Sequence, residues 1–240
     1  MARSHGKDIR AYLDWRDISG HVSQVTTELS AEAHDVTTFA SSGWKESTGG
    51  LGGWTGSIEG FYDSASSGFA AQIDAALGSA VAGRSVLSWF DGAADGVGDA
   101  GFLGSEAVVT QQAAPISVAD ITKLTATFEG NGKPGASARL LHPLSSSTTA
   151  STGATYDGST ETANGGRGTL HVLAVTGSWG FTISHSSNDT AYSALVSFTK
   201  SSSTGAETIE VTGTVKRYLR YSLTNSSAGV VDWVAGFARY

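Results

Sequence analysis

The stretch His34–Ser64, HDVTTFASSGWKESTGGLGGWTGSIEGFYDS, carries the pattern that decides the fold. It opens with a β-branched run, Val36–Phe39, which is typical of a strand. A tract of glycine, serine and threonine follows at about Ala40–Gly53 and predicts a surface loop that is mobile in the isolated chain. A second strand is expected to begin at Trp54. The stretch therefore predicts two strands joined by a long loop.

Alternation is the main signal in the second of these strands. Every second residue from Trp54 to Tyr62 is aromatic, aliphatic or glycine, which predicts that this face of the strand is packed. The positions between them are mainly polar, with Phe61 as the exception, and predict a face in contact with water. The polar positions are Thr55, Ser57, Glu59 and Asp63.

The composition favours a mainly β protein with many turns. Charged residues make up 15% of the 240 residues, against about 25% in ordinary domains, and there are 31 glycines. The chain has no cysteine, which excludes a disulfide framework and a cysteine-based metal site. No apolar run approaches the roughly 20 residues of a membrane span, and the N-terminus lacks an apolar signal-peptide core. We expect a protein that is made and used in the cytoplasm, or that leaves by a route other than secretion, such as lysis, and that does not associate with a membrane.

Charge is distributed unevenly along the chain. Residues 1–130 hold 7 Lys/Arg and 16 Asp/Glu, a net charge of −9, whereas residues 131–240 hold 8 and 6, a net charge of +2. A surface that grips nucleic acid needs positive charge, so the first half is not expected to clamp DNA.

The rest of the sequence predicts one helix and a second group of strands. In SSGFAAQIDAALGSAV, residues 66–81, apolar side chains recur every four residues, which indicates a helix. The run GNGKPGAS, residues 130–137, predicts a boundary between domains at 1–131 and 132–240. Beyond it, short alternating strands such as WGFTISHS and GVVDWVAGFARY predict a β-sandwich.

No motif indicates catalysis, a metal or a cofactor. The six histidines form no H-x-H or H-E-x-x-H pattern, and no G-x-S-x-G elbow is present. Glu59 and Glu129 fall on expected strands and are the carboxylates that a polysaccharide-cleaving enzyme would use. Trp179, Tyr192 and Trp233 are candidates for a sugar-stacking platform, although aromatic side chains in a sandwich more often belong to the core.

Residues 8–132 resemble a bacteriophage major tail tube protein of the siphophage type. The resemblance depends on DISGHVSQVTTELSAEAHDVTTF, the glycine- and serine-rich loop, GSIEGFYD and SVADITKLTATFEGNG, in that order. The second half, with TLHVLAVTGSWGFTISHS and TIEVTGTVKRYLRYSLT, resembles a jelly-roll module joined to phage structural proteins. It is also similar to discoidin-like and carbohydrate-binding sandwiches.

The resemblance implies a fold, an assembly and a set of partners. The fold would be a tail-tube β-barrel or sandwich with one helix, followed by a jelly-roll-like sandwich that decorates the tail. Six copies would form a ring, and stacked rings in the virion tail would make the conduit for DNA ejection. Partners would be further copies of the chain, the tape-measure, tail-tip and terminator proteins, DNA in non-specific passage, and host surface glycans.

The resemblance also implies roles for particular residues. The lumen-facing set is Thr55, Ser57, Glu59 and Asp63. The inter-ring stacking loop contains Trp44, Lys45, Glu46 and Leu51. An N-terminal arm between subunits contains Ile9, Tyr12 and Trp15. The glycan contacts are Trp179, Tyr192 and Trp233.

Three other functions fit the sequence. A carbohydrate-binding or adhesion protein would be a monomer whose sugar affinity depends on a tryptophan. A polysaccharide-cleaving enzyme would depend on Glu59 or Glu129. A capsid decoration protein would form trimers instead of hexamers.

Overall fold

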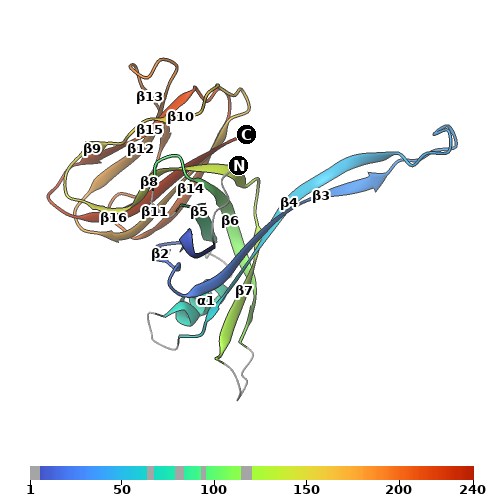
Figure 1. Ribbon diagram of the computed structural model, residues 1–240, viewed down its shortest axis with the longest axis horizontal. Helices are drawn as coiled ribbons and strands as arrows, with labels where there is room; N and C mark the ends of the chain where they lie inside the picture. The colour runs from blue at the N-terminus through green and yellow to red at the C-terminus, as the bar shows by residue number, and fades with distance from the viewer. Residues whose placement is uncertain (1–5, 64–67, 79–83, 93–95, 115–120) are drawn as a thin grey trace. The chain divides into compact units, whose positions relative to one another are not determined.

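The computed structural model describes residues 6–63, 68–78, 84–92, 96–114 and 121–240. These residues form a mainly β protein with one α-helix, as the sequence predicts (Figure 1). By contacts the chain divides into two compact units. The sandwich unit contains residues 1–22, 84–107 and 134–240, and the ribbon unit contains residues 23–83 and 108–133. The units interleave along the chain, whereas the sequence predicts consecutive domains that meet near residue 131.

The sandwich unit consists of a large antiparallel sheet packed on a smaller one. The large sheet has the strand order β14-β11-β16-β8-β6-β5-β1-β2, and the smaller has the order β10-β15-β12-β13, with β9 beside β15. The strands of the large sheet are β1 (Ile9–Leu13), β2 (Arg16–Asp17), β5 (Ser85–Asp91), β6 (Ala100–Ala113), β8 (Gly135–Ser147), β11 (Gly166–Val175), β14 (Gly205–Val211) and β16 (Val231–Arg239). Those of the smaller sheet are β9 (Ser151–Thr152), β10 (Tyr156–Asp157), β12 (Trp179–Ser186), β13 (Ser193–Ser197) and β15 (Tyr218–Asn225).

Strand β16 is buried on both faces because apolar groups cover it from two sides. Trp233 and Phe237 belong to the core that also holds the apolar residues of β12 and β15. Val234 and Ala238, at the alternate positions, belong to a second core with Tyr12 of β1. This near-continuous burial differs from the alternation that the sequence analysis expects for GVVDWVAGFARY.

The ribbon unit is a four-stranded antiparallel sheet with a helix. Its strand order is β3-β4-β7-β6, of which β6 contributes residues 108–113. The other elements are β3 (Val22–Asp35), β4 (Ser47–Phe61), β7 (Lys123–Gly130) and α1 (Phe69–Gly78). A short 3-10 helix, η1 (Gly6–Asp8), precedes β1 in the sandwich unit. The helix α1 is not long and apolar enough to cross a membrane, and the described residues contain no other α-helix.

Burial confirms the two faces expected for β4. Trp54, Gly56, Ile58 and Gly60 are buried, and the residues between them are exposed or half-buried. On β7, Leu124, Ala126 and Phe128 are buried in the same alternation. Phe69, Ala70 and Ile73 of α1 are buried as well, so the predicted helix contributes to this core. Its expected last turn, residues 79–81, lies outside the described residues.

The prediction of a long loop at about Ala40–Gly53 is wrong at both of its boundaries. Half of the glycine- and serine-rich tract, residues 47–53, belongs to strand β4, and the β-branched run Val36–Phe39 lies in the connecting loop. Strand β3 extends to Asp35 before it. The structure explains the glycine at position 50, because a Cβ atom there would overlap the side chains of Glu32 and His34 on β3. Glycine thus lets two strands approach closely in a segment that reads as a loop.

Candidate functional site: an assembly surface

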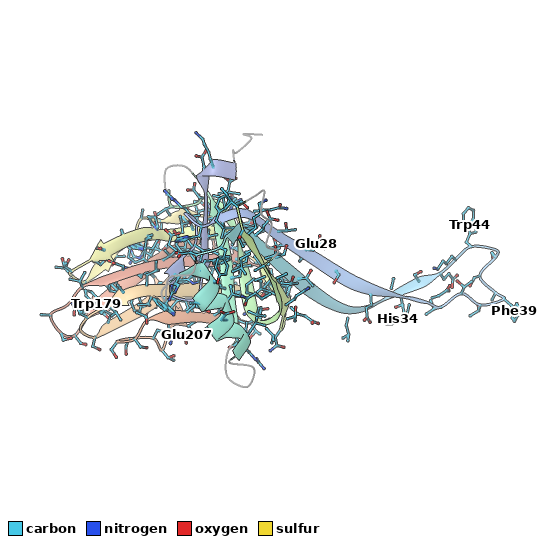
Figure 2. All side chains as sticks on the ribbon, turned by 90° about the horizontal axis from the view of Figure 1, so that it is seen from below. Glu28, His34, Phe39, Trp44, Trp179 and Glu207 are labelled. Carbon is cyan, nitrogen blue, oxygen red and sulfur yellow. The ribbon has the colours of Figure 1, made fainter. Side chains whose placement is uncertain are left out.

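Strands β3 and β4 form a two-stranded ribbon whose outer part has no core. Every residue from 28 to 53 is exposed on both faces except Ser41 in the tip. Figure 2 shows Glu28, His34 and the tip residues Phe39 and Trp44 at successive points along this ribbon. Strands of this length, 14 and 15 residues, are long by the standards of globular proteins. An isolated two-stranded hairpin is only marginally stable in water, so we expect this ribbon to be stabilised by contact with a partner surface.

The ribbon tip, residues 36–46, is folded by its own hydrogen bonds. The backbone N–H of Val36 donates to the Glu46 carbonyl at 3.0 Å, and the Glu46 N–H donates to Thr37 Oγ1 at 2.9 Å. The Thr38 N–H donates to Ser41 Oγ at 2.9 Å, which accounts for the burial of Ser41. Ser42 and Gly43 both have positive φ and reverse the chain. The tip is therefore a defined turn structure within the single chain.

One charged side chain of the tip, Lys45, is paired with a carboxylate at the end of β3. Lys45 Nζ lies 3.8 Å from the Asp35 carboxylate, and both side chains are largely exposed. Hydrogen bonds from the Thr37 side chain and backbone hold the pKa of Asp35 below its ordinary value. An exposed pair of this kind is worth little in stability and is readily exchanged for another partner. The predicted role of Lys45 and Glu46 in contacts between rings stays a prediction.

Large apolar side chains of the ribbon project into solvent. Phe39 is fully exposed, Trp44 is 81% exposed and Leu51 is 79% exposed. Leu29 and Val36 are exposed on the same ribbon. Exposed apolar side chains that gather on one element are typical of interaction surfaces. The structure thus brings Trp44 and Leu51 of the predicted stacking loop onto one exposed ribbon, together with Lys45 and Glu46.

The sheet of the ribbon unit has two free edges. Among the described strands, β3 pairs only with β4, so its outer edge is unpaired along its whole length. At the other side, β5 pairs with β6 only as far as Ala107, and β8 pairs with the start of β6. Among the described residues, no strand pairs with the outer side of residues 108–113 of β6, which makes this the second free edge. Free edges are templates for pairing with another chain.

The polar face of this sheet is rich in hydroxyl groups. Thr55, Ser57 and Glu59 of β4 stand opposite Glu129, Thr127 and Thr125 of β7. A shallow hollow of about 210 Å³ lies on this unit, lined by Thr26, Glu28, Thr55, Gly56, Ser57 and Thr127. The structure therefore brings three of the four predicted lumen residues together on one face. The fourth, Asp63, lies just beyond the end of β4 and is half-buried.

Charge on this unit is strongly negative. By sequence, residues 23–83 and 108–133 contain 3 Lys and 9 Asp/Glu, a net charge of −6 out of −7 for the whole chain. On the polar face, Lys123 is held by Glu59, with Nζ 2.7 Å from the carboxylate. The cation is thus neutralised by its neighbour, while Glu129 adds a further negative charge.

The arrangement of Glu59 and Glu129 does not match a glycosidase. Glu59 pairs in register with Thr125, and Glu129 with Thr55, so the two carboxylates stand four residues apart on neighbouring strands. That separation is about 13 Å, beyond the roughly 5 to 9.5 Å between the paired carboxylates of glycosidases. In the described residues, no group of three or more His, Asp or Glu side chains is placed to hold a metal ion.

The predicted N-terminal arm is part of the sandwich unit. Strand β1 pairs with β5 over its whole length, and Tyr12 is buried in the core beside Phe90. Tyr12 is therefore unavailable to another subunit, because its own chain covers it. Ile9 is half-buried at the start of β1, and Trp15 is 42% exposed with the Arg16 guanidinium 4.2 Å from its ring centre.

The predicted sugar platform is not formed. Trp179 and Trp233 are 2% and 1% exposed and fill the core between the two sheets. Tyr192 is half-buried, its hydroxyl donates to the Asp189 carboxylate, and Arg220 lies 3.7 Å from its ring centre. The alternation of β12 and β16 does not reveal which face points inward, so the sequence alone left these rings as candidates.

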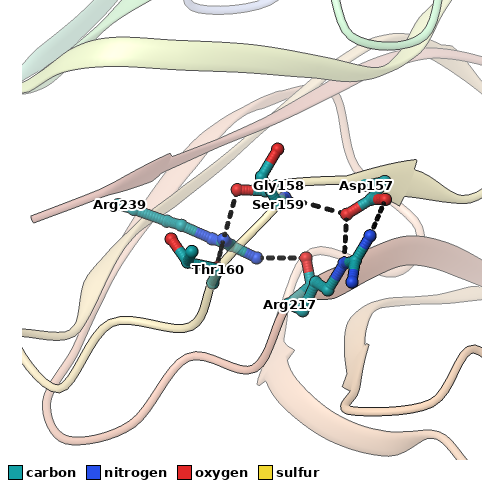
Figure 3. Close-up of polar contacts among 6 residues, drawn as sticks. All are labelled: Asp157, Gly158, Ser159, Thr160, Arg217 and Arg239. Carbon is teal, nitrogen blue, oxygen red and sulfur yellow. Dashed lines mark hydrogen bonds and ion pairs between the residues drawn. The ribbon is translucent and has the colours of Figure 1, made fainter.

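One polar cluster was not predicted as a site, although its Arg217 lies in the segment TIEVTGTVKRYLRYSLT. Arg217 donates to both Asp157 oxygens, at 2.7 Å from Nε and 2.6 Å from Nη2 (Figure 3). These bonds and that of the Ser159 backbone lower the pKa of Asp157 to about 2. Arg239 near the C-terminus donates to the carbonyls of Gly158, Thr160, Lys216 and Arg217. Every partner of the two arginines here belongs to the sandwich unit itself, so the cluster stabilises the fold of this unit.

No protein-family model matches the sequence, and no curated protein does either. Several solved structures are similar. A chain of the virion of a native gene transfer agent particle is 20% identical, covers 55% of this chain and 97% of its own length, and has a TM-score of 0.41.

Two further structures come from the phage SPP1. A chain of its tail tube is 11% identical over 54% of this chain and 77% of its own, with a TM-score of 0.40. The SPP1 Dit protein of the hub adsorption apparatus is 9% identical over 95% of this chain and 98% of its own, with a TM-score of 0.35. At these identities and TM-scores the likeness concerns fold only.

Proposed function

We propose that this chain is a structural virion protein, the major tail tube subunit of a siphophage-type tail. Hexameric rings of it stack into the conduit for DNA ejection. The observation that carries the proposal is the four-stranded sheet of the ribbon unit with a free edge at each side. Such a sheet closes into a ring when part of β3 of one copy pairs with residues 108–113 of the next, because both free edges then have a partner along those residues.

The dimensions of such a ring suit a conduit. Four strands from each of six copies give 24 strands, which at about 4.8 Å each measure about 115 Å around. A cylinder of that circumference is about 37 Å across between backbones, and strand tilt widens it further. A barrel of this width encloses an aqueous channel that passes a DNA duplex. In this proposal the polar face with Thr55, Ser57 and Glu59, together with Asp63, lines the channel.

The charge of the ribbon unit supports a lumen that DNA slides through. Phosphate groups bind where Lys and Arg replace their counterions, which requires unpaired cations. The cation on the polar face, Lys123, is already paired with Glu59, and the unit as a whole carries −6. Repulsion between this face and the DNA backbone would keep passage non-specific.

The exposed ribbon supports stacking, because it has no core of its own and projects Phe39, Trp44 and Leu51. In this proposal the tape-measure, tail-tip and terminator proteins contact the tube inside and at its ends. The sandwich strands of residues 132–240 decorate the tail.

Paired proline substitutions test the ring closure. Backbone amides of neighbouring residues in a strand point to opposite sides, so of Gln111 and Gln112 one faces β7 and the other faces the free edge. Proline removes that amide. We expect one of Gln111→Pro and Gln112→Pro to fold as a stable monomer that forms no rings, and the other to lose a bond to β7.

The readouts are negative-stain microscopy and sedimentation velocity. Six-fold rings or tubes from the unaltered chain support the proposal, and loss of rings in the well-folded proline variant supports edge pairing. Monomers at all concentrations would contradict it, and trimers would favour a capsid decoration protein. Rings formed equally by both proline variants would contradict the edge pairing.

A further inference from the structure

The boundary run GNGKPGAS, residues 130–137, contains the pair Asn131–Gly132. This pair lies in the connection between β7, which ends at Gly130, and β8. After Lys133 the chain passes from the ribbon unit to the sandwich unit. Of the asparagines in the sequence, only Asn131 and Asn164 are followed by glycine. The two pairs can therefore be compared within one chain.

An asparagine that precedes a glycine can lose its side-chain amide without an enzyme. The backbone nitrogen of the glycine loses its proton and bonds to Cγ of the asparagine, and the bond from Cγ to the amide nitrogen breaks, so that ammonia leaves. Water then opens the resulting five-membered succinimide to aspartate or to isoaspartate. The net reaction consumes one water, releases one ammonia and adds a negative charge, with no oxidation or reduction. Glycine favours ring closure because it has no Cβ to hinder the approach of its nitrogen.

The first pair lies in the open, within irregular backbone. Asn131 and Gly132 are both exposed, and neither belongs to a strand or a helix. Gly132 has a φ of 91°, a conformation that residues with a Cβ atom rarely adopt. The turn between β7 and β8 thus requires the glycine that makes Asn131 reactive.

The second pair is held in place. Gly165 is buried, and a Cβ atom there would overlap the Val211 carbonyl. Its own carbonyl accepts from the Tyr240 N–H at 3.1 Å, and the Asn164 N–H donates to Thr162 Oγ1 at 3.2 Å. Ring closure requires the asparagine and the glycine to rotate toward each other. The packing and the hydrogen bonds around Asn164 oppose this rotation.

We propose that Asn131 is a site of spontaneous deamidation, and that its isoaspartyl product loosens the end of β7. Isoaspartate routes the backbone through the side-chain carbon, which changes the direction of the chain as it leaves Gly130. A Cβ atom at Gly130 would overlap the indole of Trp54, which is itself buried. A shift of Gly130 therefore disturbs the packing of Trp54 within the ribbon unit. The proposal does not depend on assembly of the chain.

Timed incubation of the purified chain at neutral pH, followed by peptide mass spectrometry, tests the site. In the folded chain we expect Asn131 to convert faster than Asn164 by about tenfold or more, because Asn164 reacts only after its local hydrogen bonds open. In urea, where neither pair is held, the two should convert at similar rates. The proposal would be overturned by equal rates in the folded chain, or by an Asn131 that converts only in urea.

A variant without the reactive amide tests the consequence. Asn131→Ser is the matched control, because serine has no side-chain carbonyl to attack and is common in turns. After the same incubation, the unaltered chain should unfold at a lower urea concentration than before, in proportion to the isoaspartate found at position 131. Asn131→Ser should keep its midpoint. An unchanged midpoint in the converted chain would overturn the loosening of β7.

Discussion

Acid should destabilise the sandwich unit through two buried histidines. His171 of β11 bridges the Asp14 carbonyl, 2.6 Å from Nδ1, and Ser88 Oγ, 2.9 Å from Nε2. A carbonyl only accepts, so Nδ1 carries the proton and Nε2 accepts from the Ser88 hydroxyl. His142 of β8 has the same pattern, with the Trp233 carbonyl and Ser145, and its ring stacks on Trp233 at 3.7 Å.

Both rings are therefore held neutral in the folded protein. Burial lowers the pKa of each to about 4 from an ordinary value of 6.5, although a hydrogen bond to a backbone carbonyl opposes the shift. The unfolded chain takes up these protons near pH 6.5 and the folded protein only near pH 4. Stability from this source is complete above about pH 6.5 and is lost as the pH falls toward 4.

The magnitude follows from the two pKa values. Each histidine lowers the unfolding free energy of the protein by about 2 kcal/mol when the pH falls from 7 to 5, and by about 3 kcal/mol once the pH is below 4. Urea unfolding of the monomer, followed by tryptophan fluorescence at pH 5, 6 and 7, measures the slope. Asp14 is buried beside His171 with a raised pKa, and its titration has the opposite sign.

Variants separate the histidines from Asp14 and from other carboxylates. His142→Gln and His171→Gln should each reduce proton uptake on unfolding by about one between pH 5 and 7. His21→Gln, at an exposed histidine, is the matched control and should leave the slope unchanged. Equal stability of the unaltered chain at pH 5 and pH 7, or an unchanged slope in both buried-site variants, would refute the reasoning.

Three further predictions concern packing, the lumen and the ribbon. Gly130→Ala should cost about 1–3 kcal/mol, because its Cβ would overlap the Trp54 indole, whereas Gly49→Ala meets open space and should be neutral in chemical unfolding. Thr55→Lys should make assembled tubes retain DNA in a filter-binding assay at low salt and release it at high salt; retention equal to the unaltered tube would contradict the lumen assignment. Trp44→Ser alone should change monomer stability by less than about 0.5 kcal/mol while reducing tube length in micrographs, and unaffected tubes would count against ribbon stacking.

Local patterns predicted the elements that bury one face. The four-residue apolar period placed α1, and the two-residue alternation placed the packed and polar faces of β4. Both signals arise because a single face meets the core, so that sequence spacing alone reports it. Alternation also predicted strands in the sandwich unit, although β16 there is buried on both faces.

The ribbon could not be predicted from such patterns. Its outer half is exposed on both faces, so selection for burial leaves no alternation, and glycine and serine there are typical of a loop. Conversely, Val36–Phe39 reads as strand, yet hydrogen bonds of Thr37 and Thr38 with Glu46 and Ser41 fold it into a turn. Side chains that bond to nearby backbone compete with regular structure.

The interleaving of the two units along the chain could not be predicted from the sequence for a different reason. Strand β1 pairs with β5, and β6 with β8, across long separations along the chain. Composition marked a turn near residue 131, but only these pairings assign residues 1–22 and 84–107 to the sandwich unit. Tyr12 is buried because β1 pairs with β5, whereas Trp179 and Trp233 are buried between the two sheets of the sandwich unit, where aromatic side chains are more often found than on a sugar-binding surface.

Hydrogen exchange on the two sheet edges is the most direct test of the assembly. Amides that face outward from β3 and from residues 108–113 of β6 should exchange rapidly in the monomer and become strongly protected in assembled rings. Outward amides of β13 in the sandwich unit serve as the internal reference. Rapid exchange at both edges in the assembled particles, or full protection already in the monomer, would contradict the pairing of free edges between copies.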